Sequence, residues 1–307
     1  MNQTNYKDSW NVRSQSAEAA IAAVDGSTDE TIVQHTGQWA AEQIKTALNI
    51  SDTDIVLELG CGVGRIGREL APSCQHWTGV DISENMIQHA TKRLSDRPNC
   101  SFHQLTRTSL DMIEDNSIDK AYSIAVFCHM DKEDLFIYLQ ELNRVIKPGG
   151  MIFVETWNLC SDVGWRRWVY EPLVWSNSDQ SQRKDVARNQ FCTPEEFELY
   201  VQRAGFQVLA NFHESQSVQI CAGKQLDAQG IVSAKARIAA DAANIAYSPL
   251  YAVMFGQFVD VIFGSMKAKD MLAFIDENSD TSEAALYRPY VYSLWQKNAD
   301  IWGDTPD

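Results

Sequence analysis

A glycine-rich turn and a single carboxylate carry the clearest chemical signal in this sequence. Gly60-Cys61-Gly62-Val63-Gly64 directly follows the β-branched run Asp54–Leu59, and the residues after it have helical composition. Glycine lets a backbone come close to a ligand, and a helix N-terminus offers free N–H donors and a partial positive charge. Asp81 ends the next apolar run, where its carboxylate can accept hydrogen bonds from a ribose diol. The pattern predicts a site for a cofactor that contains a nucleoside.

The register of the glycines leaves two kinds of cofactor open. Gly62, Gly64 and Gly67 satisfy the G-x-G-x-x-G spacing of dinucleotide-binding proteins. The first glycine after the apolar run is Gly60, however, and a count from Gly60 puts Arg65 where the third glycine should stand. A nicotinamide-dependent oxidoreductase is therefore the second alternative for this motif.

The elements that must position these residues alternate between strands and helices. Short apolar runs bounded by turn residues predict strands at 54–59, 76–82, 100–105, 118–127, 151–156, 206–212 and 217–223. Helical spacing between the first five runs implies parallel βαβ units, and the last two runs suggest an antiparallel closing pair. We therefore expect an α/β fold with a Rossmann-like, doubly wound, mostly parallel seven-stranded sheet whose last strand is antiparallel.

Three segments fall outside the regular alternation. Two helices are expected ahead of the first strand, within an N-terminal helical cap at residues 1–50. Residues 159–190 interrupt the core at 51–225 and predict an insertion after strand five that serves as a substrate lid. Residues 226–307 predict a helical C-terminal extension, which could be a lid, a homodimer interface or a scaffold.

An ordered set of motifs makes the chain resemble the class I S-adenosylmethionine (SAM)-dependent methyltransferases, of the type that acts on small molecules. The motifs are Glu58–Gly64, Val80–Ser83 with Met86, Asp115–Asp119, and Arg144-Val145 with Lys147–Gly150. The resemblance spans about Ile55–Lys224 and rests on the order of the set, because each motif alone is short. It implies SAM as cofactor, S-adenosyl-L-homocysteine (SAH) as product, and a small-molecule acceptor that is methylated at O, N or S.

The resemblance also implies roles for individual residues. It places Gly60 and Gly62 beneath the methionine part of SAM, Asp81 on the ribose hydroxyls, and Ile82 and Met86 beside the adenine. The expected cofactor-binding residues are Glu58, Gly60, Gly62, Gly64, Arg65, Asp81, Ile82, Met86, Thr106, Arg107 and Val126. Many members of the family carry an acid after strand three that accepts from the adenine amino group. This chain has Leu105-Thr106-Arg107 there, so Thr106 would contact the adenine through its hydroxyl or its backbone.

Candidates for the acceptor side come from the end of strand four and from the insertion. Methyl transfer from a sulfonium is a direct displacement that depends on alignment and exclusion of water. His129 follows strand four and is the candidate base, and a histidine that only hydrogen-bonds at a strand end is the alternative. The expected substrate residues are Trp157, Trp165, Arg166, Trp168 and Tyr170. These aromatics could instead fix a lid to the core. Tyr6 and Trp10 could close over the cofactor, and ordinary packing of the N-terminal region is the alternative for them.

Charge and cysteine usage restrict the partners that we expect. A formal net charge of −15 repels phosphate backbones and anionic lipid surfaces, so neither nucleic acid nor a membrane is expected. The seven cysteines are odd in number and widely spaced, which is typical of reduced thiols in a cytosol, and no His/Cys spacing suggests a metal site. The N-terminus lacks a secretory pattern, and the apolar stretch Leu250–Gly264 is too short to cross a bilayer. We expect a cytoplasmic protein with a small-molecule substrate. The long acidic tail also prompts a further alternative, a non-catalytic SAM-binding sensor or interaction module.

Overall fold

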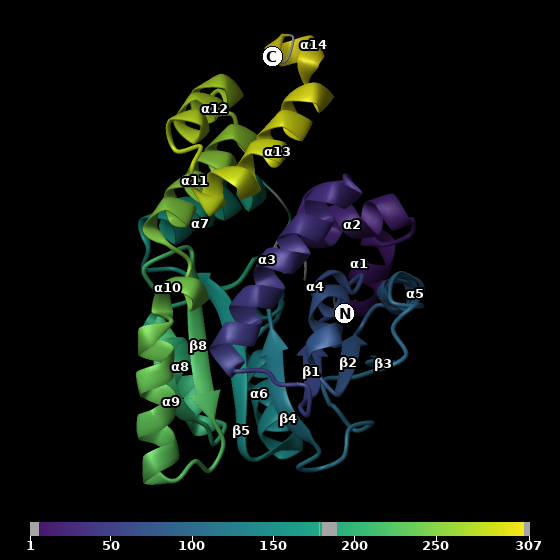
Figure 1. Ribbon diagram of the computed structural model, residues 1–307. Coiled ribbons are helices and arrows are strands. Elements are labelled where there is room, and N and C mark those ends of the chain that lie inside the picture. The colour runs from purple at the N-terminus through teal and green to yellow at the C-terminus, as the bar shows by residue number, and fades with distance from the viewer. Residues whose placement is uncertain (1–5, 178, 180–188, 304–307) are drawn as a thin grey trace.

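A mixed β-sheet forms the centre of the molecule (Figure 1). The computed structural model describes residues 6–177, 179 and 189–303. The strand order is β3-β2-β1-β4-β5-β8-β7, and β6 pairs with β5 outside this path. The strands are β1 (Ile55–Leu59), β2 (His76–Asp81), β3 (Cys100–Gln104), β4 (Ile118–Ser123), β5 (Ile146–Asn158), β6 (Phe191–Cys192), β7 (Gln207–Phe212) and β8 (Ser217–Gly223).

The order of the strands creates a crevice at one edge of the sheet. Neighbouring strands within the group β1 to β5 run parallel to each other. Strand β8 runs antiparallel to both of its neighbours, β5 and β7. The chain adds β2 and β3 on one side of β1 and then β4 and β5 on the other, which opens a crevice at the carboxyl ends of β1 and β4. The doubly wound sheet with an antiparallel last strand is confirmed, and the two-residue β6 is an addition to the seven expected strands.

Each face of the sheet buries its own apolar core. The covering helices are α3 (Glu30–Leu48), α4 (Arg65–Leu70), α5 (Glu84–Arg93), α6 (Lys132–Val145), α8 (Pro194–Arg203) and α9 (Ala228–Ala240). Helices α6 and α8 pack on one face with Leu57 and Leu59, and the other four pack on the opposite face with Val56. Successive strand residues point to opposite faces, so β1 must be apolar on both sides. This explains the nearly continuous apolar run that precedes the glycine turn.

Strand four ends earlier than the sequence predicts. The apolar run extends to Phe127, but β4 stops at Ser123, whose hydroxyl donates to the Leu59 carbonyl at 3.1 Å. Ala125 then adopts a left-handed backbone with φ of 56°, and Phe127–His129 forms a short 3-10 turn. An apolar run cannot distinguish a buried turn from a buried strand, because both need the same side chains. The early turn brings residues 124–130 across the carboxyl edge of the sheet.

The N-terminal region contains one helix more than expected. The two expected helices are α2 (Ala17–Asp25) and α3, and the additional helix is α1 (Tyr6–Arg13). Ser16 caps α2 by accepting from the Ala19 amide, and α2 ends at Gly26, whose φ is 77°. Helix α1 buries none of its residues to the level of the core. It therefore lacks the apolar stripe by which the other helices could be predicted.

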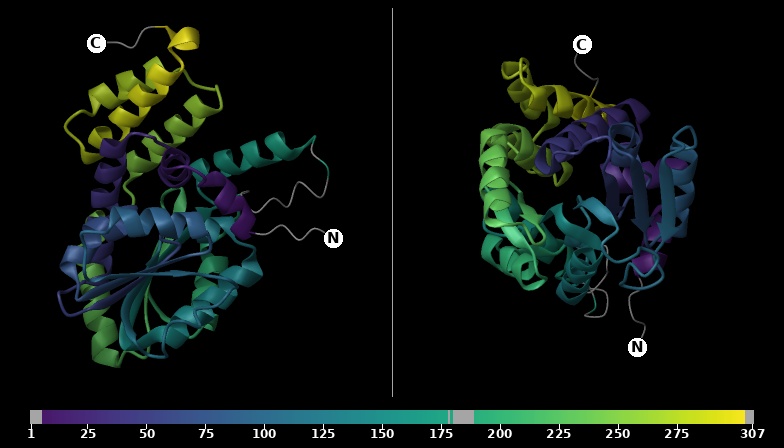
Figure 2. Two further views of the ribbon diagram at one scale, coloured as in Figure 1. Left: turned by 90° about the vertical axis from the view of Figure 1, so that its right-hand side faces the viewer. Right: turned by 60° about the horizontal axis from the view of Figure 1, so that its bottom comes forward.

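The C-terminal extension forms a helical layer at the carboxyl edge of the sheet (Figures 1 and 2). Its helices beyond α9 are α10 (Ala242–Ile245), α11 (Pro249–Ile262), α12 (Ala268–Glu277), α13 (Ser282–Lys297) and α14 (Ala299–Trp302). Helices α11 to α13 share an apolar core of their own, which includes Met254, Met271 and Val291. The expected insertion contains α7 (Asp162–Trp175), which packs against α11, whereas residues 178 and 180–188 of it lie outside the described part of the chain.

Helix α3 connects the extension to the core. The Trp39 ring stacks on Tyr247 and Tyr251, with centroids 5.6 and 5.2 Å apart. Gln43 donates to the Ile245 carbonyl at 2.6 Å. These contacts tie the turn before α11 to a helix that also packs on the sheet.

One described stretch, Ala242–Ile262, is long and apolar enough to cross a membrane by length and composition alone. It consists of α10 and α11, separated by a break in which Ala246 and Ser248 are extended. The length test on Leu250–Gly264 did not include α10, which accounts for the difference from the sequence-based expectation.

Candidate active site

A cavity of about 1070 Å³, including open solvent at its mouth, lies at the carboxyl ends of β1, β2 and β4. The residues around it come from the glycine turn, the ends of these strands, the loop after β3, helix α6 and the N-terminal helices. They include Glu58, Gly60, Gly62, Arg65, Asp81, Ile82, Met86, Val126 and His129 from the sequence-based predictions.

The glycine turn forms the floor of the cavity. Gly60, Gly62 and Gly64 have φ values of 76°, 51° and 73°, which residues with a Cβ rarely adopt. A Cβ on Gly60 would overlap with the Val126 side chain, and one on Gly62 would lie 2.8 Å from Val24 Cγ1. Gly64 does not line the cavity and instead starts α4. The two remaining glycines therefore meet both a backbone and a packing requirement.

Asp81 faces the same space from the end of β2. Its Oδ2 accepts from the Gly62 amide and its Oδ1 from the Ser83 amide, each at 2.9 Å. Burial raises the pKa of this carboxyl to about 6, although the backbone hydrogen bonds favour the charged form. Each carboxylate oxygen has a second lone pair, so Asp81 can still accept from hydroxyls of a ligand. The bond to Gly62 also fixes the glycine turn relative to β2.

The loop after β3 differs from the sequence-based expectation. Thr106 and Arg107 are exposed and do not line the cavity, and Arg107 forms an ion pair with Asp111. Thr108 lines the cavity instead, and its hydroxyl donates at 2.9 Å to Asp134 of α6, which lines it too. An acid therefore reaches this side of the cavity from a helix. Sequence reasoning missed Asp134 because an acid in the first turn of a helix is already explained by the helix dipole.

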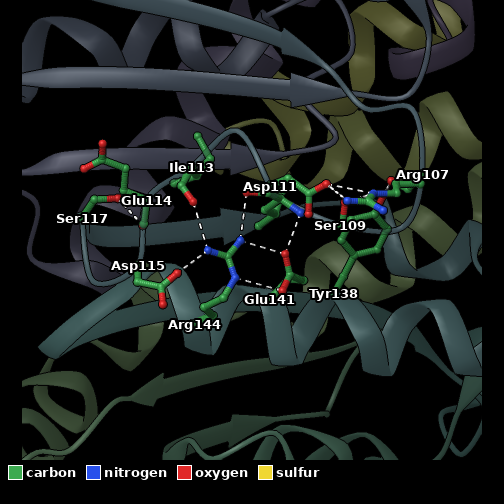
Figure 3. A network of polar contacts seen from close by, with 11 residues as sticks. Arg107, Ser109, Asp111, Ile113, Glu114, Asp115, Ser117, Tyr138, Glu141 and Arg144 are labelled. Carbon is green, nitrogen blue, oxygen red and sulfur yellow. Dashed lines mark hydrogen bonds and ion pairs between the residues drawn. The ribbon is translucent and has the colours of Figure 1, made fainter.

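Arg144 anchors this loop to α6 (Figure 3). Its guanidinium donates to the carbonyls of Ile113 and Leu110 at 3.0 and 2.9 Å and pairs with Asp115 and Glu141. Asp115 and Arg144 belong to two of the motifs recognised in the sequence, so these motifs meet in space. The network holds the start of the segment that leads into β4.

His129 lines the cavity at the end of the turn after β4. Its Nδ1 is buried and has no hydrogen-bond partner among the described residues. The ring lies edge-on to Trp10, with centroids 5.2 Å apart. Burial, reinforced by the charges of Arg13 and Arg167, lowers the pKa of His129 to about 4. The imidazole is therefore neutral near pH 7 and has a nitrogen available for a proton.

Helices α1 and α2 close the cavity on the side away from the sheet. Tyr6 and Trp10 of α1 and Val24 of α2 line it. Ser83 and Asn85 hold α1 in place: the Ser83 hydroxyl donates to Asn11 Oδ1 at 2.8 Å, and Asn85 Nδ2 donates to the Asn11 carbonyl at 3.0 Å. The expectation that Tyr6 and Trp10 lie over the cofactor site agrees with this position.

Glu58 and Arg65 line the cavity beside the glycine turn. Glu58 is buried and accepts from the Tyr122 hydroxyl at 2.7 Å, and burial raises the pKa of its carboxyl to about 8. Arg65 Nε lies 3.6 Å from Asp25 Oδ1. Asp25 also accepts from the Tyr290 hydroxyl at 2.6 Å, so this side of the cavity connects to the C-terminal extension.

The structure does not bring the five expected substrate residues to the cavity. Trp157 packs against Phe191 and Phe255, and Trp165 stacks on Trp168 with 53% of its own surface exposed. The other two residues hold α7 on α11: Arg166 pairs with Asp260, and Tyr170 stacks on Phe263. These contacts match the alternative in which the aromatics attach a helix to the core. The physical reason is that α11, whose position the sequence does not reveal, covers the face of α7 that carries Arg166 and Tyr170.

No group of three or more His, Cys, Asp or Glu side chains in the described part of the chain could hold a metal ion. All seven cysteines are free, and burial raises the pKa of the Cys61 and Cys128 thiols.

Comparisons with known proteins find similarity to methyltransferases. A family described as a methyltransferase domain matches residues 56–150. Phosphoethanolamine N-methyltransferase 1 of Zea mays is 30% identical over 164 residues, which are 44% of this chain and 33% of the maize protein. A thiol S-methyltransferase of Rattus norvegicus is 30% identical over 114 residues, 36% of this chain and 46% of the rat protein. The chain thus spans less than half the length of these relatives.

The fold comparison extends further along the chain. Magnesium protoporphyrin IX methyltransferase of Synechocystis, solved with bound SAH, matches with a TM-score of 0.54 and 16% identity over 71% of this chain and 97% of that chain. Gly67, on which the nicotinamide alternative depended, has a packing role, because a Cβ there would overlap with the Trp77 ring. Residues 56–150 thus match a methyltransferase domain, and the sheet around them has the fold of a SAM-dependent methyltransferase, with Asp81 beside the glycine turn.

Proposed function

We propose that this protein transfers the methyl group of SAM to a small-molecule acceptor by direct displacement at an O, N or S nucleophile. The observation that carries the proposal is the junction of Gly62 and Asp81, which are hydrogen-bonded at the ends of adjacent strands and line the same cavity. SAM supplies the sulfonium methyl group when it is bound. The residues of the chain bind it, orient it and keep water away from it.

The cavity divides these tasks between its walls. Gly60 and Gly62 leave room for the methionine part of the cofactor, and Asp81 accepts from the ribose hydroxyls. Ile82 and Met86 offer apolar surface to the adenine. Tyr6 and Trp10 cover the cavity and limit the access of water. Fit to the cofactor thus depends on a backbone cradle, one acceptor group and an apolar clamp.

His129 is proposed as the base for acceptors that hold their proton at working pH. It lines the cavity, it is neutral near pH 7, and Nδ1 has no partner among the described side chains and backbone groups. A general base must lie within hydrogen-bond reach of the proton that it takes, and a pKa near 4 makes this imidazole a weak base unless a bound acceptor raises that pKa. An acceptor that is already deprotonated would not require it.

The acceptor itself is proposed only as a class. The names of the relatives specify a nitrogen in one case and a thiol sulfur in another, and each match covers less than half of this chain and of the relative. Of the residues expected for the substrate, the cavity contains none, so recognition of the acceptor falls to Trp10, His129, Met130 and other residues of the described lining.

Titration calorimetry with SAM and SAH tests the proposal. Wild-type protein should bind both ligands, and Asp81→Ala should weaken binding by about 10- to 100-fold, since buried hydroxyls lose their acceptor. Asp96→Ala is the control, because Asp96 is an exposed carboxylate that pairs with Arg68 away from the cavity. Incubation of a metabolite extract with methyl-labelled SAM then identifies the acceptor. Binding without transfer to any metabolite would favour a sensor over an enzyme, and absence of binding would end the proposal.

A further inference from the structure

A buried polar chain runs from the C-terminal extension to the back of the cofactor cavity. Its centre is Glu155 of β5, which is only 5% exposed. Glu155 Oε1 accepts from the Ala125 amide at 3.1 Å, and Oε2 accepts from the Tyr247 hydroxyl at 3.0 Å. Gln219 of β8 completes the chain, since its Nε2 donates to Glu155 Oε2 at 3.4 Å and its Oε1 accepts from the Tyr247 amide at 3.2 Å.

The cavity end of this chain is a turn with an unfavourable backbone. Ile124, Ala125 and Val126 all line the cavity, and Ala125 has a φ of 56°. An alanine in the left-handed region persists only where its surroundings hold it. The Val126 side chain fills the space that a Cβ on Gly60 would need, so a shift of this turn would change the space above the glycine floor. Glu155 is the side chain that accepts from the amide of the strained residue.

The other end of the chain belongs to the extension. Tyr247 lies in the break between α10 and α11, and its ring packs against the rings of both Trp39 and Tyr251, with centroids 5.6 and 4.5 Å away. The stack fixes the ring, and the hydroxyl then points to a carboxylate on the sheet. Tyr247 therefore links the extension to Glu155, and Glu155 in turn accepts from the Ala125 amide in the cavity wall.

We propose that Glu155 is a positioning residue of the cofactor site, and that the C-terminal extension supports cofactor binding by holding Glu155 through Tyr247. This inference rests on the proposed SAM site and goes beyond it, because it gives the extension a role that is independent of the acceptor. Glu155 acts through Ala125 and does not itself line the cavity.

Two matched tyrosine variants test the link to the extension. Tyr247→Phe removes one hydroxyl and keeps the stacked ring, and it should raise the Kd of SAH by about three- to tenfold in titration calorimetry, as expected for one lost buried hydrogen bond. Tyr251→Phe is the control, because Tyr251 belongs to the same stack but has no hydrogen bond to Glu155. Its SAH Kd should equal that of the wild type.

Variants of Glu155 test the positioning role. Glu155→Gln keeps an acceptor for the Ala125 amide and should stay within about threefold of the wild-type Kd, whereas Glu155→Leu removes the acceptor and should raise the Kd by about tenfold or more. Circular dichroism shows whether each variant is folded. If Glu155→Leu does not fold, the comparison of Tyr247→Phe with Tyr251→Phe decides.

The outcomes separate this inference from the proposed function. Equal Kd values for the two tyrosine variants, or a wild-type Kd for folded Glu155→Leu, would overturn the positioning role while SAM binding stands. A wild-type protein that does not bind SAH would overturn the cofactor site and the inference together.

Discussion

The floor and the roof of the cavity are built in different ways. The floor consists of the glycine turn and Asp81, where backbone amides and one carboxylate at the ends of β1 and β2 define the geometry. The roof consists of side chains from α1 and α2, such as Tyr6, Trp10 and Val24. A backbone-defined surface restricts the residue types at each position, whereas a wall of side chains tolerates many. Under the proposed function, this difference would separate the part of the site that binds the cofactor from the part that can vary with the acceptor.

The largest effect on this comparison is expected from Gly60→Ala. The new Cβ would overlap with Val126 and would require a left-handed φ, so we expect the Kd of SAH to rise by about 10- to 100-fold or more. Gly149→Ala is the matched control, because Gly149 has a φ of 85° but no atom within 4 Å of the added Cβ. It should lower the free energy of unfolding and leave SAH binding unchanged. Similar SAH affinities for both variants would contradict a backbone-defined floor.

The next largest effect is expected at His129. His129→Gln should lower kcat by about 100-fold or more if the imidazole is the base, with the SAM Kd changed by less than about threefold. The assay uses the acceptor that the labelled-SAM experiment identifies. His103→Gln, on β3 and outside the cavity lining, should leave kcat unchanged. Equal turnover for the two variants would leave His129 a packing role beside Trp10.

A pH series tests whether the Glu58 carboxyl beside the glycine turn is buried in solution. Folding raises the pKa of Glu58 from 4.5 to about 8 through burial, so the folded state binds this proton more tightly than the unfolded chain. The free energy of unfolding must then fall as pH rises from 4.5 to 8. Glu58→Gln should remove the part of this fall that Glu58 causes. Between pH 5 and pH 8, the free energy of unfolding of the variant should therefore fall by on the order of 1–3 kcal/mol less than that of the wild type.

Denaturant titrations at the two pH values measure this difference. Asp81 and Glu155 contribute to the wild-type fall with the same sign, because burial raises the pKa of both carboxyls, so the variant should retain a smaller slope. An unchanged slope in Glu58→Gln would mean that Glu58 is hydrated in solution.

The smallest effect is expected from Trp165→Ala. Trp165 is half exposed and lies outside the cavity, so its loss should change the SAH Kd by less than about twofold and the free energy of unfolding by about 0.5 kcal/mol or less. Trp10→Ala sharpens the contrast, because Trp10 lines the cavity and its loss should raise the SAH Kd measurably in the same titration. A large loss of kcat/KM in Trp165→Ala would restore an acceptor role for the insertion.

Features that local chemistry determines could be predicted from the sequence. The glycine turn, the end of β2 and the Ser83 cap of α5, whose hydroxyl accepts from the Met86 amide at 3.2 Å, all follow from short patterns. The expected sheet is confirmed, and residues 56–150 match the expected methyltransferase domain, for the same reason. Residue roles at the cofactor remain predictions that the variants above test.

Features that depend on contacts between distant segments could not be predicted from the sequence. Asp134 reaches the cavity only because α6 packs beside the loop after β3, and α7 is covered by α11 from the other end of the chain. The turn at Ala125 cannot be distinguished from a strand within the apolar run, because the side chain that accepts from the Ala125 amide belongs to Glu155, 30 residues later. A cytoplasmic location and a homodimer through residues 226–307 stay predictions, and light scattering would measure the second.

The attachment of α1 has a consequence for ligand exchange. Any molecule that passes under Tyr6 and Trp10 must first separate Asn11 from Ser83 and Asn85, because these hydrogen bonds fasten the helix to the start of α5. Ser83 directly follows Ile82 and lies two residues from Asp81. The hydrogen bonds that hold α1 therefore involve residues next to the proposed ribose-binding carboxylate. Departure of SAH by that route would therefore disturb α1 and, at the same time, the residues around Asp81 to which α1 is bonded.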